Sequence, residues 1–108
     1  MGLAERHATR GKTPRVEQAK IDELSREVPT WSVATIEGHP ELRRRLNFKD
    51  FKALMVFVNR VAEVAQAEDH HPDLAIHYSQ LDLSLWTHDA GGLTENDFIL
   101  AAKIDALG

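Results

Sequence analysis

Four of the chain's six histidines lie in one stretch, between residues 69 and 97, and three of them, His70, His71 and His88, are candidates for chemistry. His70 and His71 are adjacent and precede Pro72, and His88 ends a later apolar run. An unperturbed imidazole exchanges its proton near a pH of about 6.5, so histidine suits general acid and base work at neutral pH. Histidines that converge from two segments therefore favour proton-transfer chemistry, such as the elimination of water from carbon.

Two acidic residues in the same stretch are suited to orient these imidazoles. Asp69 precedes the histidine pair and Asp97 follows His88, and either carboxylate can accept the second ring N–H of a histidine. Asp97 also fits another role, because Thr94 with an acidic residue three positions later is the pattern of a helix capping box. Both interpretations of Asp97 are open from spacing alone.

Metal binding and plain structure are the competing interpretations of the histidines. Zinc takes three histidine or carboxylate ligands and a water, but adjacent His70 and His71 point apart, and no HExxH or HxH pair is present. We expect no metal. Histidines at a helix exit also bond terminal carbonyls, and a strand-end histidine can be simple surface. We assign no role to the remaining histidines, which are His7, His39 and His77.

The elements that must position the site follow from periodicity. Apolar residues recur with helical spacing from Lys49 to Ala67, and Pro72 ends that helix at or before His71. Two strands are predicted next, over 74–78 and 81–87, with a tight connection near Ser79-Gln80. Alternation in the second strand places Leu81, Leu83, Leu85 and Thr87 on one face. The other face is predicted to carry Asp82, Ser84, Trp86 and His88.

The remaining pattern predicts an α+β fold. Thr13-Pro14 resembles a helix start, with the helix running to about residue 26. Residues 31–36 and 41–48 alternate like a hairpin around turn residues 37–40, and a last helix follows Thr94 to about residue 107. The order α-β-β-α-β-β-α indicates a four-stranded antiparallel sheet with three helices on one face.

Composition bounds the class of protein. The chain has 108 residues, 43% of them hydrophobic and 28% charged, which predicts one ordinary domain over 13–108 and a flexible tail over 1–12. The absence of cysteine excludes disulfides and thiolate chemistry. The net charge of -4 argues against nucleic-acid binding, and no segment is apolar enough for a membrane span. We expect a soluble, cytoplasmic protein.

The motif around the histidines resembles the pterin-4a-carbinolamine dehydratase family, also known as dimerisation cofactors of a homeodomain transcription factor. The resemblance extends from about residue 21 to 107. It rests on Trp31, F-K-D-F at 48–51, His70-His71-Pro72, Tyr78, Thr87-His88 and G-L-T-E-N-D at 92–97.

The resemblance implies a reaction and residue roles. Family members dehydrate 4a-hydroxytetrahydropterin to quinonoid dihydropterin, which recycles the cofactor of aromatic amino acid hydroxylases, and they form dimers or tetramers. Carried over by position, His70 and His88 would be the acid and base, and His71 would bind and orient the pterin. Asp69 and Asp97 would support them, with no bound cofactor or metal.

Two positions depart from the family pattern. Gln66 stands where a charged residue, often glutamate, is usual, and Leu74 replaces a bulky aromatic residue. Gln66 can bond a substrate but cannot act as a base. These departures, and a broad apolar surface expected around Phe57 and Val64, leave an alternative open: a non-catalytic pterin-binding or protein-dimerisation module of the same fold.

Overall fold

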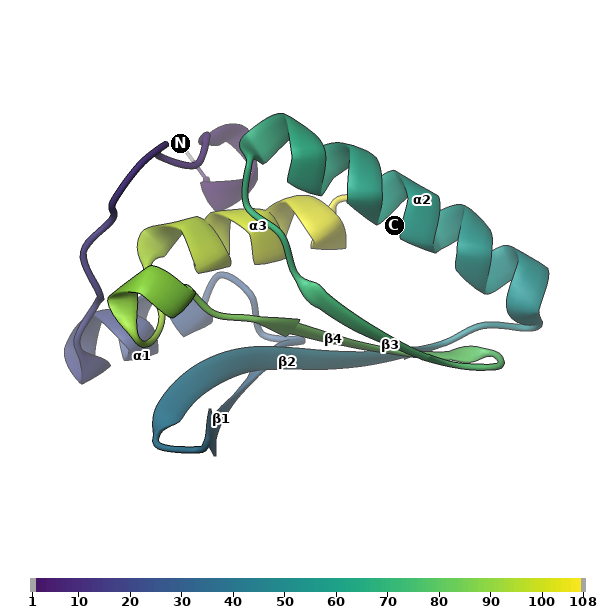
Figure 1. Ribbon diagram of the computed structural model, residues 1–108, viewed down its shortest axis with the longest axis horizontal. Helices are drawn as coiled ribbons and strands as arrows, with labels where there is room; N and C mark the ends of the chain where they lie inside the picture. The colour runs from purple at the N-terminus through teal and green to yellow at the C-terminus, as the bar shows by residue number, and fades with distance from the viewer. Residues whose placement is uncertain (1, 108) are drawn as a thin grey trace.

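The computed structural model describes residues 2–107 as a sheet covered by helices on one face (Figure 1). The elements are α1 (Gln18–Ser25), β1 (Ser32–Ile36), β2 (His39–Asn47), α2 (Phe51–Glu68), β3 (Asp73–His77), β4 (Gln80–Leu85) and α3 (Glu95–Asp105), with short 3-10 turns η1 (Leu3–Glu5) and η2 (His88–Ala90). The predicted fold class and element order are confirmed.

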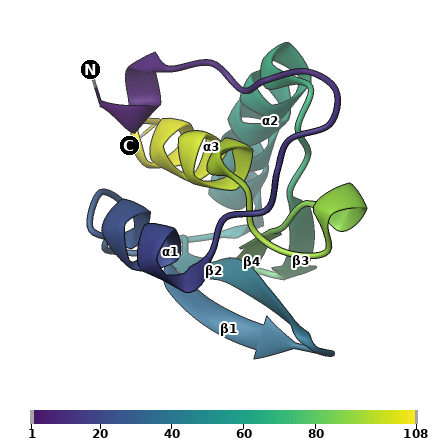
Figure 2. The same cartoon turned by 90° about the vertical axis from the view of Figure 1, so that its left-hand side faces the viewer.

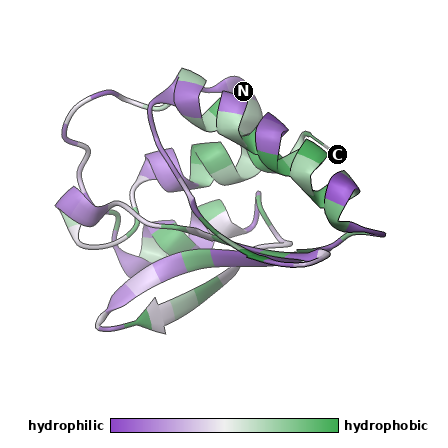
Figure 3. Cartoon of the chain, turned by 45° about the vertical axis from the view of Figure 1, so that its right-hand side comes forward, coloured by the Kyte–Doolittle hydropathy of each residue, from purple (hydrophilic) through white to green (hydrophobic). Residues whose placement is uncertain are grey.

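The sheet is antiparallel throughout, in the order β1-β2-β4-β3. On central strand β4 the side chains of Leu81, Leu83 and Leu85 are at most 1% exposed beneath the helices. Burial of each contributes about 1.5–3 kcal/mol. The apolar colour in Figure 3 lies between the two layers in the same way. The opposite face of β4 is not covered by the helices. Side chains on that face, such as that of Trp86 just after the strand, are therefore available to form a site.

Two-residue turns close both hairpins. The first is Glu37-Gly38, where both residues have positive φ (49° and 86°), as a type I′ turn requires. This turn makes His39 the first residue of β2. The second turn is Tyr78-Ser79, one residue earlier than the predicted connection, and Tyr78 takes the left-handed conformation (φ 56°).

Helix α2 begins two residues later than predicted, at Phe51 and not at Lys49. The Asp50 carboxylate accepts the Ala53 N–H at 2.8 Å and caps the helix, so Phe51 is the first helical residue. The predicted apolar surface around Phe57 and Val64 is wrong, because Phe57 is 7% exposed and Val64 is partly buried against the core. The large apolar side chains that α2 exposes are those of Phe51 and Val56. Between residues 2 and 107, no helix combines the length and apolar character that a bilayer crossing requires.

Helix α1 begins at Gln18, not at the predicted Thr13-Pro14. The backbone before it is extended, because the Val16 N–H donates to the Leu93 carbonyl at 2.8 Å. The Thr13 hydroxyl accepts from the side chain of Asn96 instead of capping a helix. Thr13 therefore bonds a residue far along the chain and not the start of a local helix. The local sequence pattern does not reveal such a partner.

The N-terminal segment lies against the helical layer, which differs from the free tail that its polar composition predicts (Figure 2). Leu3 is 3% exposed and belongs to the core. The Ala8 N–H donates to the Glu68 carboxylate at 2.7 Å, and the Thr9 N–H donates to the Asn96 side chain at 2.9 Å. The segment therefore docks on the end of α2 and the start of α3, which are the elements nearest the predicted site.

Candidate active site

The end of α2 delivers the histidine pair. Asp69 takes the left-handed conformation (φ 53°), the His70 N–H donates to the Ala65 carbonyl, and the Asp69 N–H donates to the Gln66 carbonyl. These two bonds form a Schellman motif, which usually has glycine at the left-handed position but accepts aspartate. The chain leaves the helix here, so His70 and His71 lie in the predicted exit loop.

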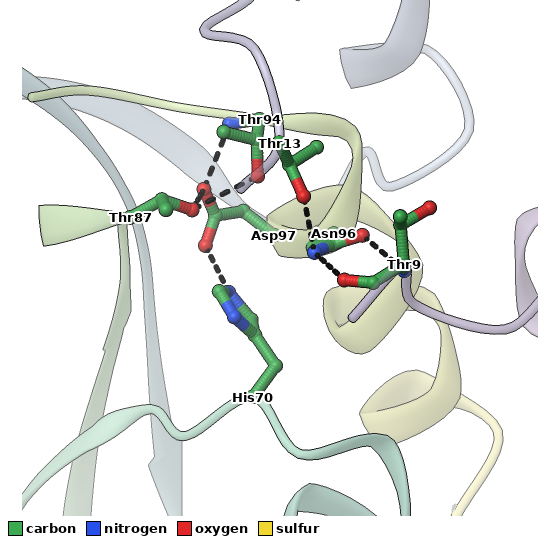
Figure 4. A network of polar contacts seen from close by, with 7 residues as sticks. All are labelled: Thr9, Thr13, His70, Thr87, Thr94, Asn96 and Asp97. Carbon is green, nitrogen blue, oxygen red and sulfur yellow. Dashed lines mark hydrogen bonds and ion pairs between the residues drawn. The ribbon is translucent and has the colours of Figure 1, made fainter. Parts of the chain in front are cut away.

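The His70 side chain is anchored from behind by Asp97. His70 Nε2 lies 2.6 Å from Asp97 Oδ1, and the two side chains are 13% and 0% exposed (Figure 4). A buried polar group needs such a partner, and the carboxylate orients the ring. His70 is therefore a fixed imidazole with one edge committed to the protein.

The second oxygen of Asp97 is also occupied. Oδ2 accepts from the Thr94 N–H and from the Thr87 hydroxyl, each at 2.9 Å, and Thr94 completes a capping box at the start of α3 (Figure 4). A carboxylate can only accept hydrogen bonds, so His70 Nε2 is the donor to Oδ1 and His70 Nδ1 is left for proton exchange. The capping and orienting interpretations of Asp97 hold together in one side chain.

His88 comes from the end of β4. It opens the 3-10 turn η2, directly after the bridge between Thr87 and Gly92. Its ring stacks on the indole of Trp86, with centroids 3.7 Å apart and planes 29° apart. The predicted sharing of one strand face by Trp86 and His88 thus appears as a direct contact.

A surface pocket of about 230 Å³ joins these segments. Its lining residues are Asp69, His70, His71, Trp86, Thr87, His88 and Asp89. Four of the residues that the sequence singled out therefore line one pocket. They are Asp69, His70, His71 and His88. Two do not line it: Asp97 lies buried behind His70, and Gln66 contacts the pocket through His71, whose Nε2 is 3.2 Å from Gln66 Oε1.

Sequence reasoning missed three wall residues of this pocket. Strand alternation placed Trp86 beside His88, but nothing in the pattern indicated that it lines a cavity. Thr87 was expected on the leucine face, and its hydroxyl donates from there to Asp97 of α3. Asp89 follows from the η2 turn, which the sequence did not predict.

The arrangement suits acid–base chemistry on a small molecule. One imidazole is fixed by a buried carboxylate and a second lines the same pocket, and imidazole side chains are suited to general acid and base catalysis. Within residues 2–107 the histidines and carboxylates do not gather into a group of three that would hold a metal ion. The expectations of no metal and no bound cofactor remain predictions.

Comparison with known proteins shows which family the chain is similar to. A family model described as "Pterin 4 alpha carbinolamine dehydratase" matches residues 14–107. A Gloeobacter violaceus protein named "Putative pterin-4-alpha-carbinolamine dehydratase 1" is 43% identical over 109 residues, covering 99% of this chain and 94% of that protein. An Acidobacterium capsulatum protein whose name is the same but for the final number is 51% identical over 87 residues, covering 81% and 90%.

Solved structures also resemble this one. A Brucella melitensis transcriptional coactivator/pterin dehydratase superposes with a TM-score of 0.78 at 31% identity, covering 86% of this chain and 97% of that one. A pterin dehydratase-like protein identified as a RuBisCO assembly factor gives a TM-score of 0.60 at 22% identity, covering 72% and 88%. The second likeness concerns the fold alone.

Proposed function

The chain belongs to the pterin 4 alpha carbinolamine dehydratase family, and on that premise we propose that it dehydrates 4a-hydroxytetrahydropterin to quinonoid dihydropterin. The observation that carries the proposal is that His70, anchored by Asp97, and His88 line one pocket. The net reaction removes water, so it needs one proton delivered and one removed. Two imidazoles that line one small pocket match that need.

The proposed mechanism assigns the two proton transfers to these histidines. One of His70 and His88 protonates the 4a-hydroxyl, the C4a–O bond breaks, and water leaves. The N5 proton goes to a histidine or to water, and the N5 electron pair forms the C4a=N5 bond. General acid–base catalysis of this kind contributes about 10²–10⁴-fold to the rate. Asp97 is a positioning residue here, because its buried carboxylate reaches His70 and not the pocket.

The remaining predicted residues are proposed to hold the substrate. His71 and Asp69 line the pocket, and His71 is steadied by Gln66 at 3.2 Å. An imidazole and a carboxylate offer the mixed donor and acceptor groups that a pterin ring and its amino group bind. We infer that His71, Asp69 and Gln66 act on pterin affinity more than on the proton transfers.

The test is the rate of quinonoid dihydropterin formation from freshly made 4a-hydroxytetrahydropterin. We expect acceleration by the wild-type protein and loss of most of it in His70→Ala and in His88→Ala, with folding retained. The matched control is His77→Ala, because His77 is 63% exposed on edge strand β3 and does not line the pocket. A folded protein that binds pterin without acceleration would instead be the non-catalytic binding module.

We propose further that the protein is a homodimer or homotetramer in the cytoplasm, serving tetrahydropterin recycling for aromatic amino acid hydroxylases. Exposed apolar side chains support assembly: Val56 on α2 is 57% exposed, and Leu74 and Ile76 on edge strand β3 are 40% and 39% exposed. Light scattering of Val56→Glu tests the α2 surface. A wild-type monomer at micromolar concentration would contradict the assembly.

A further inference from the structure

Three aromatic rings stack beside the pocket. The His39 ring lies 3.5 Å from the Trp86 ring with a 16° angle between planes, and the His88 ring lies 3.7 Å from Trp86 on a 29° angle. Trp86 stands between two imidazoles, one of which is proposed to transfer protons. His39 was assigned no role from the sequence.

The strand pattern explains why these rings meet. The register pairs Arg43 of β2 with Ser84 of β4, on the sheet face away from the helices. Strand side chains alternate, so His39 and Glu41 share the face of Arg43, and Trp86 and His88 share the face of Ser84. The antiparallel directions bring the start of β2 beside the end of β4.

His39 is held in turn by a carboxylate. His39 Nε2 lies 2.8 Å from Glu41 Oε2, and the two side chains are only 14% and 10% exposed. A carboxylate so little exposed requires a polar partner, and a bonded ring nitrogen fixes the plane of the imidazole. Glu41 thus orients His39, which lies flat on the indole.

Both faces of Trp86 are therefore covered. The indole cannot stack on a flat substrate, although it forms part of the pocket wall. The contribution that Trp86 can still make to the site is its stacking contact with His88. His88 needs such support, because among residues 2–107 no side-chain hydrogen bond holds its ring, whereas His70 has the 2.6 Å bond to Asp97.

We propose that His39 and Glu41 are positioning residues that act through Trp86 to fix the ring of His88. The inference rests on the proposed function of His88 as a proton-transfer residue. The two site histidines then have different supports: a buried carboxylate for His70, and a stack of rings closed by a carboxylate for His88. A misplaced catalytic group lowers the rate of the chemical step more than substrate affinity.

The first experiment observes the stack without any substrate. NMR should show the carbon-bound ring protons of His88 shifted upfield by the Trp86 ring current, and Trp86→Leu should remove the shift. In His39→Ala we expect the shift to shrink, because the indole has lost the ring on its other face. His39→Phe keeps a flat ring against the indole and should restore most of the shift. An unchanged His88 spectrum in His39→Ala would overturn the proposal.

The second experiment reads the same variants in the dehydratase assay. We expect His39→Ala to lower kcat by about 10–100-fold with KM changed far less, and His39→Phe to recover most of kcat. Glu41→Ala should follow His39→Ala, and Glu41→Gln, which keeps a hydrogen-bonding oxygen, should lie near wild type. Equal kcat in wild type, His39→Ala and Glu41→Ala would overturn the inference while leaving the dehydratase function intact. Absence of turnover in wild type would refute the function, and the NMR result would still decide the stack.

Discussion

The carboxylate of Asp97, which is fully buried, lies 2.6 Å from the Nε2 atom of His70. The same carboxylate accepts the Thr94 N–H and so closes the capping box of α3. One side chain therefore starts a helix and orients a site histidine that is 27 residues away in the chain. Stability and activity are linked at this position, and the two effects have to be measured separately.

Asp97→Asn is expected to lower kcat by about 10²–10⁴-fold, because an amide can present its NH₂ group to His70 and favour the wrong tautomer. Stopped-flow dehydration kinetics measure this loss, and thermal unfolding measures the accompanying loss of the cap. Thr94→Ala is the control, since it removes a cap worth about 0.5–2 kcal/mol and keeps the contact between Asp97 and His70. A similar kcat loss in both variants would mean that capping alone matters.

Asp69→Gly should separate the backbone role of Asp69 from its role in the pocket. Glycine adopts the left-handed conformation without steric cost, so the free energy of unfolding should be equal to or above that of wild type. KM for the pterin should rise, because the carboxylate on the pocket wall is lost. Steady-state kinetics and urea unfolding provide both numbers, and an unchanged KM would remove Asp69 from the substrate-binding residues.

Leu3→Ala tests whether the N-terminal segment belongs to the domain. Leu3 is 3% exposed in the core, so the truncation should cost about 2 kcal/mol or more in urea unfolding. Val33→Ala is the matched control, because Val33 is 40% exposed on edge strand β1 and its truncation should cost less than about 1 kcal/mol. Hydrogen exchange provides a second measurement, since the bonded amides of Ala8 and Thr9 should be protected. Equal stabilities and fast exchange would support a free tail.

Glu68 should make the docking of this segment pH-dependent. Burial raises the pKa of Glu68, but hydrogen bonds from the Ala8 N–H and His7, with the nearby charge of Lys103, bring its pKa below the ordinary value of 4.5. A lowered pKa in the folded state means that the ionised group stabilises the fold above pH 4.5 and that this contribution is lost as the pH falls through the folded-state pKa.

The corresponding variant is Glu68→Gln, which should lower the free energy of unfolding at pH 7 by about 1–3 kcal/mol. The difference from wild type should shrink as the pH falls below 4.5. Urea unfolding at a series of pH values measures this difference. A difference that is constant across the whole series would show that the charge of Glu68 is not responsible.

The sequence by itself determined the elements and part of the site. Alternation in β4 and the apolar stripe of α2 are local periodicities that burial enforces, and both predicted faces are present. Proline disfavours helical geometry in the residue before it, so Pro72 also predicted that His70 and His71 lie in a loop after the helix. The capping box at Thr94 and Asp97 is another local pattern, and it is confirmed.

Only the tertiary structure decided which groups meet. The bond between His70 and Asp97, the stack of His39 on Trp86, and the docking of Ala8 on Glu68 each join residues far apart in the chain. Periodicity reports which face of an element is buried, but not which partner covers it. Those pairings depend on how helices and strands pack together, and packing is set by the whole core.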